Sequence, residues 1–466
     1  MHGDVTVKRQ DYLPKLLLAV AALSACSASN GRDGKHENSK GLSKEALDEL
    51  SQSKGDAQLA FPGAVGYGAH ARGGRGGKIM PVTTLGDDGP GSLRACVEAQ
   101  GPRVCVFRVS GVIRFTKRPP RITNPYLTIA GQTAPGDGIT LAHSGGAVGL
   151  TPLLIKNTHD IVVRNIRVRA DLSGTERGSE DSFTIENSAR VILDHVSSSW
   201  ARDELVNGYA DNDWITISNS IFAYGIPKHD KCALLASDPT NAQHFSFVGN
   251  ICAHNGDRNP DINFPPGSCV EVLNNVFYNA QSEFAEIWES YGGTPVSIAG
   301  NVFKAGPNTS PSTVGVVRQS IGSKGPGAIY LNDNLFDGNF VQVTTSAQGI
   351  SRPSPTCPLT ITPLNAQVAY ASALARSGTW PRDAIDAQVV SDVRNRTGRI
   401  VKAPGIIPAF AIATAYPDSD DDGMDDRWEK ANGTNAAAYD PWEDADGNGL
   451  NNFDSFIEYL NKERGL

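Results

Sequence analysis

The sequence lacks the patterns expected of membrane-spanning and largely helical proteins. Its N-terminal apolar run, residues 16–25, has ten residues, and a membrane-spanning helix needs roughly 20. Charged residues make up only 20% of the chain, and no long amphipathic helix pattern occurs between residues 100 and 350. Glycine (48 of 466 residues) and proline (28) are abundant instead. This composition favours an all-β protein rich in turns.

The net negative charge of the chain is confined to one segment. The formal charge is −8, but residues 417–466 alone carry 14 acidic side chains against four basic ones. The tail therefore has a charge of −10, and the rest of the chain is weakly basic. Such concentrated acidity indicates metal binding or solvation and argues against a nucleic-acid partner.

The N-terminus has the layout of an export signal. A basic flank precedes the apolar run, and Cys26 follows it, so we expect residues 1–26 to be a signal peptide. The ending LSAC resembles a bacterial lipobox, in which the cysteine becomes lipidated; an ordinary secretory signal is the alternative. Ser27 suits outer-membrane sorting. We expect an exported protein, either an outer-membrane or cell-surface lipoprotein or a secreted one, with a membrane contact only through Cys26.

Export would allow the other six cysteines to be oxidised. Cys96 and Cys105 are close enough in sequence to staple a local loop, whereas the pairing among the remaining four is not determined by the sequence. The polar residues 27–59 are interpreted as a tether. A β-rich domain follows over 60–410, and an acidic calcium-binding region over 411–466.

A repeat dominates the central region. Asparagine followed by an aliphatic residue recurs, mostly every 25 to 33 residues, at 165, 219, 250, 275, 301 and 334, usually after a β-type run. This length suits one coil of a parallel β-helix, in which stacked coils bury apolar rows and asparagines can form ladders. A β-sandwich is the alternative, but hairpin signals are scarce. Helical patterns near residue 370 predict a cap on the end or side of the solenoid.

Several motifs together resemble the pectate lyase family of polysaccharide lyases. They include LTIAGQTAPGDGITL, VILDHVSSSWARDE, WITISNSIF, HDKCALL, GDRNP and PRDAIDAQVVSDVRNRTG, in order, over roughly residues 60 to 460. The branch most similar to this chain ends in an acidic calcium-loop tail. The resemblance implies an all-β fold, a right-handed single-stranded parallel β-helix, with a small C-terminal calcium-binding loop region.

The resemblance also implies a set of active-site residues. Asp181, Asp203 and Asn207 fall on calcium-ligand positions, and all three offer the oxygen ligands that calcium prefers. Asn207 stands where a carboxylate is usual, as does Ser179. Lys231 falls on a position that binds a substrate carboxylate, and Arg258 on the position of the catalytic base. Asn263, also expected to contact substrate, replaces a second arginine that is common there.

The implied reaction is β-elimination in a polyuronate chain, in which a proton leaves C5 and the C4 oxygen departs. Calcium and cationic side chains suit this reaction, because they place positive charge where negative charge develops. A guanidinium normally keeps its proton because its pKa exceeds about 12. We expect calcium and Lys231 to disfavour the protonated form of Arg258, and the activity to have an alkaline optimum.

Two segments of the tail match the twelve-residue calcium-loop template. The first, 418–429, has Asp418, Asp420, Asp422 and Glu429 at positions 1, 3, 5 and 12 and Gly423 at position 6. The second, 444–455, is degenerate because Ser455 stands at position 12. Its ligand candidates are Asp444, Asp446 and Asn448. We expect structural calcium in the first loop, and the second remains an open possibility.

The predicted function is therefore a calcium-dependent pectate lyase that acts on polygalacturonate, with Ca²⁺ as cofactor and a monomeric state. A pectin lyase would not need Asp181 and Asp203, and a polygalacturonase would need paired aspartates that the repeats lack. A non-catalytic, glycan-binding β-helix at the cell surface is the alternative from another class, and another uronan could be the substrate.

Overall fold

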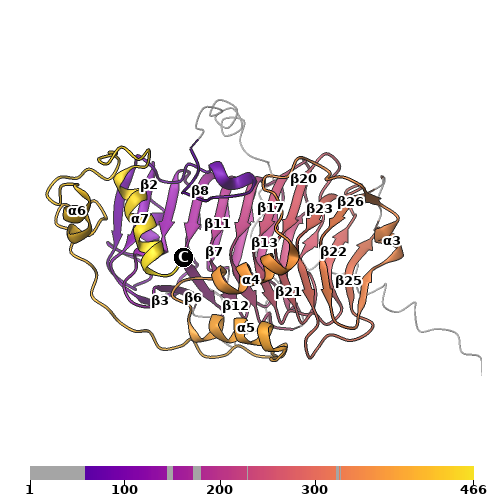
Figure 1. Cartoon of the computed structure of the whole chain (residues 1–466). Coiled ribbons are helices and arrows are strands. Elements are labelled where there is room, and N and C mark those ends of the chain that lie inside the picture. The colour runs from indigo at the N-terminus through magenta and orange to yellow at the C-terminus, as the bar shows by residue number, and fades with distance from the viewer. Residues whose placement is uncertain (1–57, 144–150, 172–179, 228, 322–324, 326) are drawn as a thin grey trace, which may run out of the picture. The chain divides into compact units, whose positions relative to one another are not determined.

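In a computed structural model, residues 58–143, 151–171, 180–227, 229–321, 325 and 327–466 are described, and all structural statements below refer to them. The predicted leader and nearly all of the tether lie outside these residues. The described chain winds into three parallel sheets, called A, B and C, and successive strands enter the sheets in the order C, A, B (Figure 1). The expected all-β parallel β-helix is confirmed.

The strands of each sheet follow one another in chain order, because each coil stacks on the one before it. Sheet A has β1 (Lys78–Val82), β2 (Arg103–Phe107), β5 (Leu127–Ala130), β8 (His159–Arg164), β11 (Ala189–Asp194), β14 (Asp213–Ser218), β17 (His244–Val248), β20 (Cys269–Leu273), β23 (Pro295–Ala299), β26 (Ala328–Asn332) and β29 (Ser351–Arg352). Sheet B has β3 (Gly111–Phe115), β6 (Ile139–His143), β9 (Ile166–Arg169), β12 (Ser197–Ser199), β15 (Ile221–Ala223), β18 (Ile251–Ala253), β21 (Val276–Tyr278), β24 (Val302–Lys304) and β27 (Leu335–Asp337). Sheet C has β4 (Arg121–Ile122), β7 (Leu153–Lys156), β10 (Phe183–Glu186), β13 (Glu204–Tyr209), β16 (Lys231–Ser237), β19 (Asp261–Ile262), β22 (Glu283–Trp288), β25 (Val314–Gln319) and β28 (Val341–Val343).

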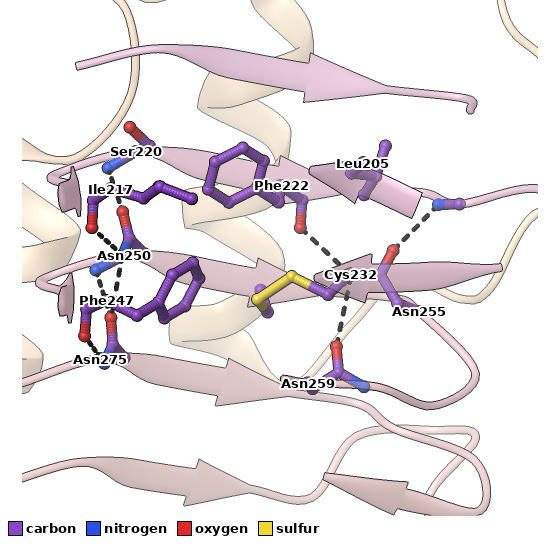
Figure 2. The surroundings of a disulfide bond; sticks show 12 residues. Leu205, Ile217, Ser220, Phe222, Cys232, Phe247, Asn250, Asn255, Asn259 and Asn275 are labelled. Carbon is purple, nitrogen blue, oxygen red and sulfur yellow. Dashed lines mark hydrogen bonds between the residues drawn. A yellow bond between two sulfur atoms is a disulfide. The ribbon is translucent and has the colours of Figure 1, made fainter. Parts of the chain in front are cut away.

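An asparagine ladder closes the turns between sheets A and B. Asn250, Asn275, Asn301 and Asn334 bond one another across consecutive coils, with Nδ2 to Oδ1 distances of 3.0–3.2 Å. Figure 2 shows the first pair, Asn250 and Asn275. The prediction that the repeated asparagines form a ladder is wrong for Asn165 and Asn219. Both lie one position earlier in the turn, with positive φ, and Ser220 occupies the ladder position of its coil.

Aromatic rows and disulfides fill and fasten the solenoid. Phe277 and Phe336 lie on either side of Phe303 in the core, at centroid distances of 5.2 and 4.9 Å. The expected Cys96–Cys105 link is present, and Cys232–Cys252 crosses the core from β16 in sheet C to β18 in sheet B (Figure 2). The third disulfide, Cys269–Cys357, connects residues 88 positions apart. Each crosslink limits the freedom of the unfolded chain.

The helices lie outside the solenoid. They are α2 (Leu93–Val97), α3 (Thr345–Gln348), α4 (Ala366–Arg376), α5 (Ala384–Asn395), α6 (Asp426–Asn432) and α7 (Asn452–Glu463), with the short 3-10 helices η1 (Tyr67–His70) and η2 (Gly131–Thr133). Helices α4 and α5 pack along the outer face of sheet B, so the predicted cap covers a side. Arg169 on β9 holds this layer by ion pairs to Asp383 and Asp386 at 2.9 and 2.8 Å. None of the described helices is long and apolar enough to cross a membrane.

The acidic tail packs on the first strands of sheet A. Met424 and Phe456 from the tail join Ile79 and Val106 in one buried cluster, and α7 lies across this part of the sheet (Figure 1). Two ion pairs fasten the contact, Arg108 with Asp418 and Arg75 with Asp454, both at 3.3 Å. The tail therefore covers β1 and β2 in sheet A, whereas the predicted active-site residues belong to sheet C.

Candidate active site

Consecutive coils bring most of the predicted active-site residues together on sheet C. Asp181 lies two residues before β10, and Asp203 lies immediately before β13. Lys231 begins β16, where it pairs in register with Glu204, and it forms an isolated bridge with Asp257. Arg258 precedes β19 on the next coil. Residues that are distant in sequence become neighbours because parallel coils keep the same strand in register.

The acidic end of this site consists of three carboxylates. Asp181, Asp203 and Glu204 each place an oxygen within 4.8 Å of the others. Backbone and hydroxyl donors orient Asp181, whose Oδ1 accepts from the Glu204 amide at 3.1 Å and Oδ2 from Thr184 at 2.7 Å. Hard oxygen ligands in this number suit calcium. Sequence reasoning missed Glu204, because two consecutive acids at a strand start are expected to point in different directions.

Asn207 belongs to the same cluster but presents its nitrogen to it. Its Nδ2 donates to Asp181 Oδ2 at 3.0 Å, and its buried Oδ1 has no hydrogen-bond partner. A buried oxygen without a partner is costly unless a cation or water completes it. The four side chains Asp181, Asp203, Glu204 and Asn207 therefore fit a divalent cation, with Glu204 supplying the charge that Asn207 lacks.

The protonation of this cluster depends on burial and mutual repulsion. Burial, and then the neighbouring charge of Asp203, raise the pKa of Asp181 to about 6. The same causes raise the pKa of Glu204 well above its usual value. Carboxylates with raised pKa values hold protons until a cation replaces them, so the site favours cation binding more strongly as the pH rises.

The cationic residues of the site are paired with carboxylates. The Lys231 amine contacts Asp257, a residue that the sequence did not single out. The Arg258 guanidinium contacts Glu204 through Nη1, and its Nε lies 3.6 Å from Asp261. Arg258 itself has positive φ and precedes Asn259 and Pro260, two residues that favour turns.

The expectation that neighbouring cations favour loss of the Arg258 proton does not match its surroundings. Burial alone would lower the pKa of Arg258, but Glu204 and Asp261 outweigh that effect and raise it. The carboxylates around Arg258 include Asp261, three residues away, and Glu204 and Glu286, which come from β13 and β22. The last two were missed because only the stacking of coils places them there. Burial raises the pKa of Asp261 to about 7 and that of Glu286 to about 9.

Asn263 lies just beyond β19, and its amide is already engaged. Its Nδ2 donates to Ser290 Oγ at 2.8 Å, and its Oδ1 accepts from the Ser290 hydroxyl at 3.1 Å. The side chain is 7% exposed. An uncharged amide that is already hydrogen-bonded binds a substrate carboxylate more weakly than a guanidinium would.

The first tail loop forms a second oxygen-lined cluster, away from sheet C. Asp418, Asp420 and Asp422 converge, and Asp440 joins Asp422 and Glu429 from outside the predicted loop. Both carboxylate oxygens of Asp420 and of Glu429, and Oδ2 of Asp422, are buried without a hydrogen-bond partner. Such orphaned anionic oxygens fit a divalent cation. Sequence reasoning missed Asp440, because the loop template ends at position 12.

The second tail loop has the same backbone pattern but a weaker set of ligands. In both loops the carboxylate at position 1 accepts hydrogen bonds from the backbone amides of positions 5 and 6. Asp418 accepts from Asp422 and Gly423, and Asp444 accepts from Asn448 and Gly449, all at 3.0–3.1 Å. The carboxylates of Asp444 and Asp446 are exposed, and Asn448 bonds Asp446 and Ser455. The structure thus brings the predicted residues of each loop together, with orphaned buried oxygens in the first loop.

Comparison with known proteins shows to which family the chain belongs. A family profile described as "Pectate lyase" matches residues 133–378. A probable pectate lyase C of Neosartorya fischeri is 34% identical over 403 residues, covering 81% of this chain and 88% of the relative. A probable pectate lyase C of Emericella nidulans is 40% identical over 261 residues, covering 54% of this chain and 55% of the relative.

Solved structures share the fold. The major cedar pollen allergen jun a 1 superposes with a TM-score of 0.53 at 20% identity, over 68% of this chain and 92% of the allergen. The thermostable pectate lyase PL 47 gives a TM-score of 0.52 at 15% identity, over 69% of this chain and 98% of that protein. With the family match and the extended sequence identity, the chain belongs to the pectate lyase family and is a polysaccharide lyase.

Proposed function

We propose that the protein is a calcium-dependent pectate lyase that cleaves de-esterified polygalacturonate by β-elimination to unsaturated oligogalacturonates. The observation that carries the proposal is the row formed by the Asp181–Asp203–Glu204 cluster, Arg258 and Lys231 along sheet C. A carboxylate cluster next to two cations suits a polyanionic chain that is held through a metal ion and direct ion pairs.

Each residue has a proposed role in the reaction. Asp181, Asp203, Asn207 and Glu204 would hold calcium, which supplies positive charge to a uronate carboxylate and lowers the barrier to forming the carbanion next to it. Lys231 would bind a second uronate carboxylate, for which it must leave Asp257. Arg258 would remove the C5 proton, and Asn263 would contact the chain nearby.

Export is part of the proposal. The six cysteines within the described residues form three disulfides, and such bonds persist in oxidising compartments. We propose a secreted or surface-located enzyme, with lipidation of Cys26 as the anchor if the N-terminal signal is a lipobox. The tail calcium of the first loop is proposed to be structural, because Met424 and Trp428, which lie within this loop, pack on β1 and β2 in sheet A, whereas the residues proposed for catalysis belong to sheet C.

The activity assay follows the ultraviolet absorbance of the unsaturated uronate product. With polygalacturonate and calcium at alkaline pH, we expect a steady rise in absorbance that a chelator abolishes and added calcium restores. Below pH about 6 the rate should fall, because protonated Asp181 no longer serves as a cation ligand. A protein that binds polygalacturonate but never yields the absorbing product would instead be a glycan-binding β-helix.

Glu204 gives a direct test of the proposed calcium site. Replacing Glu204 by glutamine removes one of three clustered carboxylates, so calcium binding measured by titration calorimetry should weaken about tenfold or more. Glu186→Gln is the matched control, because Glu186 is a carboxylate on β10 of the same sheet that pairs with Lys156 at 2.6 Å. Equal affinity in the two variants would remove Glu204 from the ligand set.

A further inference from the structure

A tryptophan stands exposed on the outer face of sheet A. Trp214, the second residue of β14, is 41% exposed. Its indole stacks on the His244 imidazole, with centroids 4.2 Å apart and 9° between the ring planes. Tyr67 meets the indole edge-on, at 6.0 Å and 72°. The three rings form one aromatic platform, defined here as Tyr67, Trp214 and His244.

The platform is held by a rigid framework. Asp213 Oδ1 lies 2.9 Å from His244 Nδ1 and also accepts from the His244 amide at 2.8 Å. Helix η1, which carries Tyr67, docks on the sheet through the amides of Tyr67 and Gly68, which donate to Ser246 and Thr216 at 2.9 and 2.8 Å. A binding surface that is already ordered loses little conformational freedom when a ligand arrives.

Close packing keeps η1 on the sheet. A Cβ at Gly68 would lie 2.4 Å from the Val191 carbonyl oxygen, so only glycine permits this approach of the helix to β11. Tyr67 is further fixed by its hydroxyl, which donates to the Pro358 carbonyl at 3.2 Å. The platform is therefore part of the solenoid wall.

Polar groups surround the exposed ring. In the strand register Arg190 lies beside Trp214, between the pairs Ala189–Asp213 and Val191–Ile215, and its guanidinium binds Asp160. On the other side lies His244 with its partner Asp213. A flat apolar face with hydrogen-bonding groups at its border suits a pyranose ring, which offers C–H bonds to the indole and hydroxyl or carboxylate groups to the border.

A sugar fits this surface better than a protein does. Stable protein interfaces need a broad, largely desolvated apolar core, whereas the two ring neighbours of Trp214 carry a hydroxyl and an imidazole nitrogen. The chain is a polysaccharide lyase, so a sugar polymer is the ligand that it meets during its own reaction. Trp214 lies in sheet A, and the residues proposed for catalysis lie in sheet C or in the turns that flank it.

We propose that the platform of Tyr67, Trp214 and His244 is a second, non-catalytic binding site for a uronate ring of the polymer substrate. This inference rests on the proposed function for the identity of the polymer. Binding at the platform holds a long chain on the enzyme while sheet C acts on another part of it. The site therefore affects retention on the polymer and leaves the turnover of short oligomers unchanged.

The test measures the two properties separately for Trp214→Ala in the full-length protein. Retention on insoluble, covalently crosslinked polygalacturonate is measured with chelator present, because sheet C is proposed to hold the polymer through calcium, and turnover is measured with calcium on soluble short oligomers. We expect retention to fall about tenfold and turnover to stay unchanged. Trp214→Phe keeps a stacking ring and should retain most of the binding. Leu335→Ala, which removes an apolar side chain of sheet B that is 37% exposed, should change neither.

Three results would overturn the proposal: equal retention of the wild type and Trp214→Ala, equal losses in Trp214→Ala and Leu335→Ala, or stronger retention of the wild type on a neutral glucan than on polygalacturonate. The retention assay does not need lyase activity. The two hypotheses can therefore fail separately. Unchanged retention of Trp214→Ala would contradict the platform, whereas a wild type that gives no unsaturated product would contradict the proposed function.

Discussion

Replacing Arg258 by lysine is expected to lower kcat on polygalacturonate by about 10²- to 10⁴-fold, the usual contribution of a positioned general base. The guanidinium is held from two sides, with Nη1 on Glu204 and Nε 3.6 Å from Asp261. A lysine ammonium is a single point charge and cannot satisfy both carboxylates from one position. The measurement is the initial rate of absorbance increase at saturating polymer and calcium.

Arg318→Lys is the matched control for this prediction. Arg318 lies on β25 of the same sheet and binds Glu289 with two nitrogens, at 3.0 and 2.7 Å, outside the proposed site. Its replacement should leave kcat within about twofold of the wild type, since it touches none of the proposed machinery. If Arg258→Lys kept most of its activity, Arg258 would be excluded as the base.

The pH dependence of the wild-type rate also tests the role of Arg258 as the base. The carboxylates around Arg258 raise its pKa, so its deprotonated fraction is very small at neutral pH and grows with each step towards alkaline pH. A base that must first lose its proton gives a rate that rises with pH. We expect this alkaline rise in kcat, and a profile that is flat from neutral to strongly alkaline pH would contradict the role of Arg258.

The fold could be predicted from the sequence because each coil of a solenoid repeats the same pattern of short strands and turns. The spacing of the repeated asparagines equals the length of one coil, because the four asparagines from Asn250 onwards occupy the same position in consecutive coils. Asn165 and Asn219 show the limit of this pattern, because asparagine also favours the positive-φ position one residue earlier in the same turn. Cys269–Cys357 was not predictable, because that pairing depends on where residues after the solenoid return to it.

The candidate site was predictable only in part, for a different physical reason. The resemblance placed Asp181, Asp203, Lys231 and Arg258, and the coil register then brought them together. Glu204 was missed, because it lies 54 residues from Arg258 in sequence and only the stacking of coils brings the two together. Asp261 lies only three residues after Arg258, but no motif in this turn predicts that its carboxylate faces the guanidinium. The same reason explains why the partner of Lys231 and the carboxylate environment of Arg258 required the structure.

Calcium is expected to raise the stability of the tail most strongly at alkaline pH, by about 4 kcal/mol at a concentration 1,000 times its dissociation constant. The relevant carboxylates are in the first loop, where burial first, and then neighbouring carboxylates, raise the pKa of Asp422 to about 7 and that of Glu429 to about 8. Their ordinary values are 3.8 and 4.5. The folded tail therefore binds protons more tightly than the unfolded chain does.

The sign of the pH dependence follows from that difference. With chelator, the stabilisation from these bound protons is complete below pH about 4 and is lost as the pH rises through 7 and 8. Calcium replaces the protons, so the loss should disappear in its presence. The measurement is the rate of proteolytic cleavage within residues 416–466, at pH 5 and pH 9, with calcium and with chelator.

Paired variants assign the effect to the first loop. Asp420→Asn removes a carboxylate whose two oxygens are buried without partners, and it should abolish most of the calcium protection. Asp446→Asn changes the same loop position in the exposed second loop, and it should change protection little because that loop lacks the carboxylate at position 12. Equal loss in both variants would show that the two loops bind calcium as one unit. Full protection by calcium in Asp420→Asn would contradict the assignment of the calcium effect to the first loop, because that variant lacks one of the loop's clustered carboxylates.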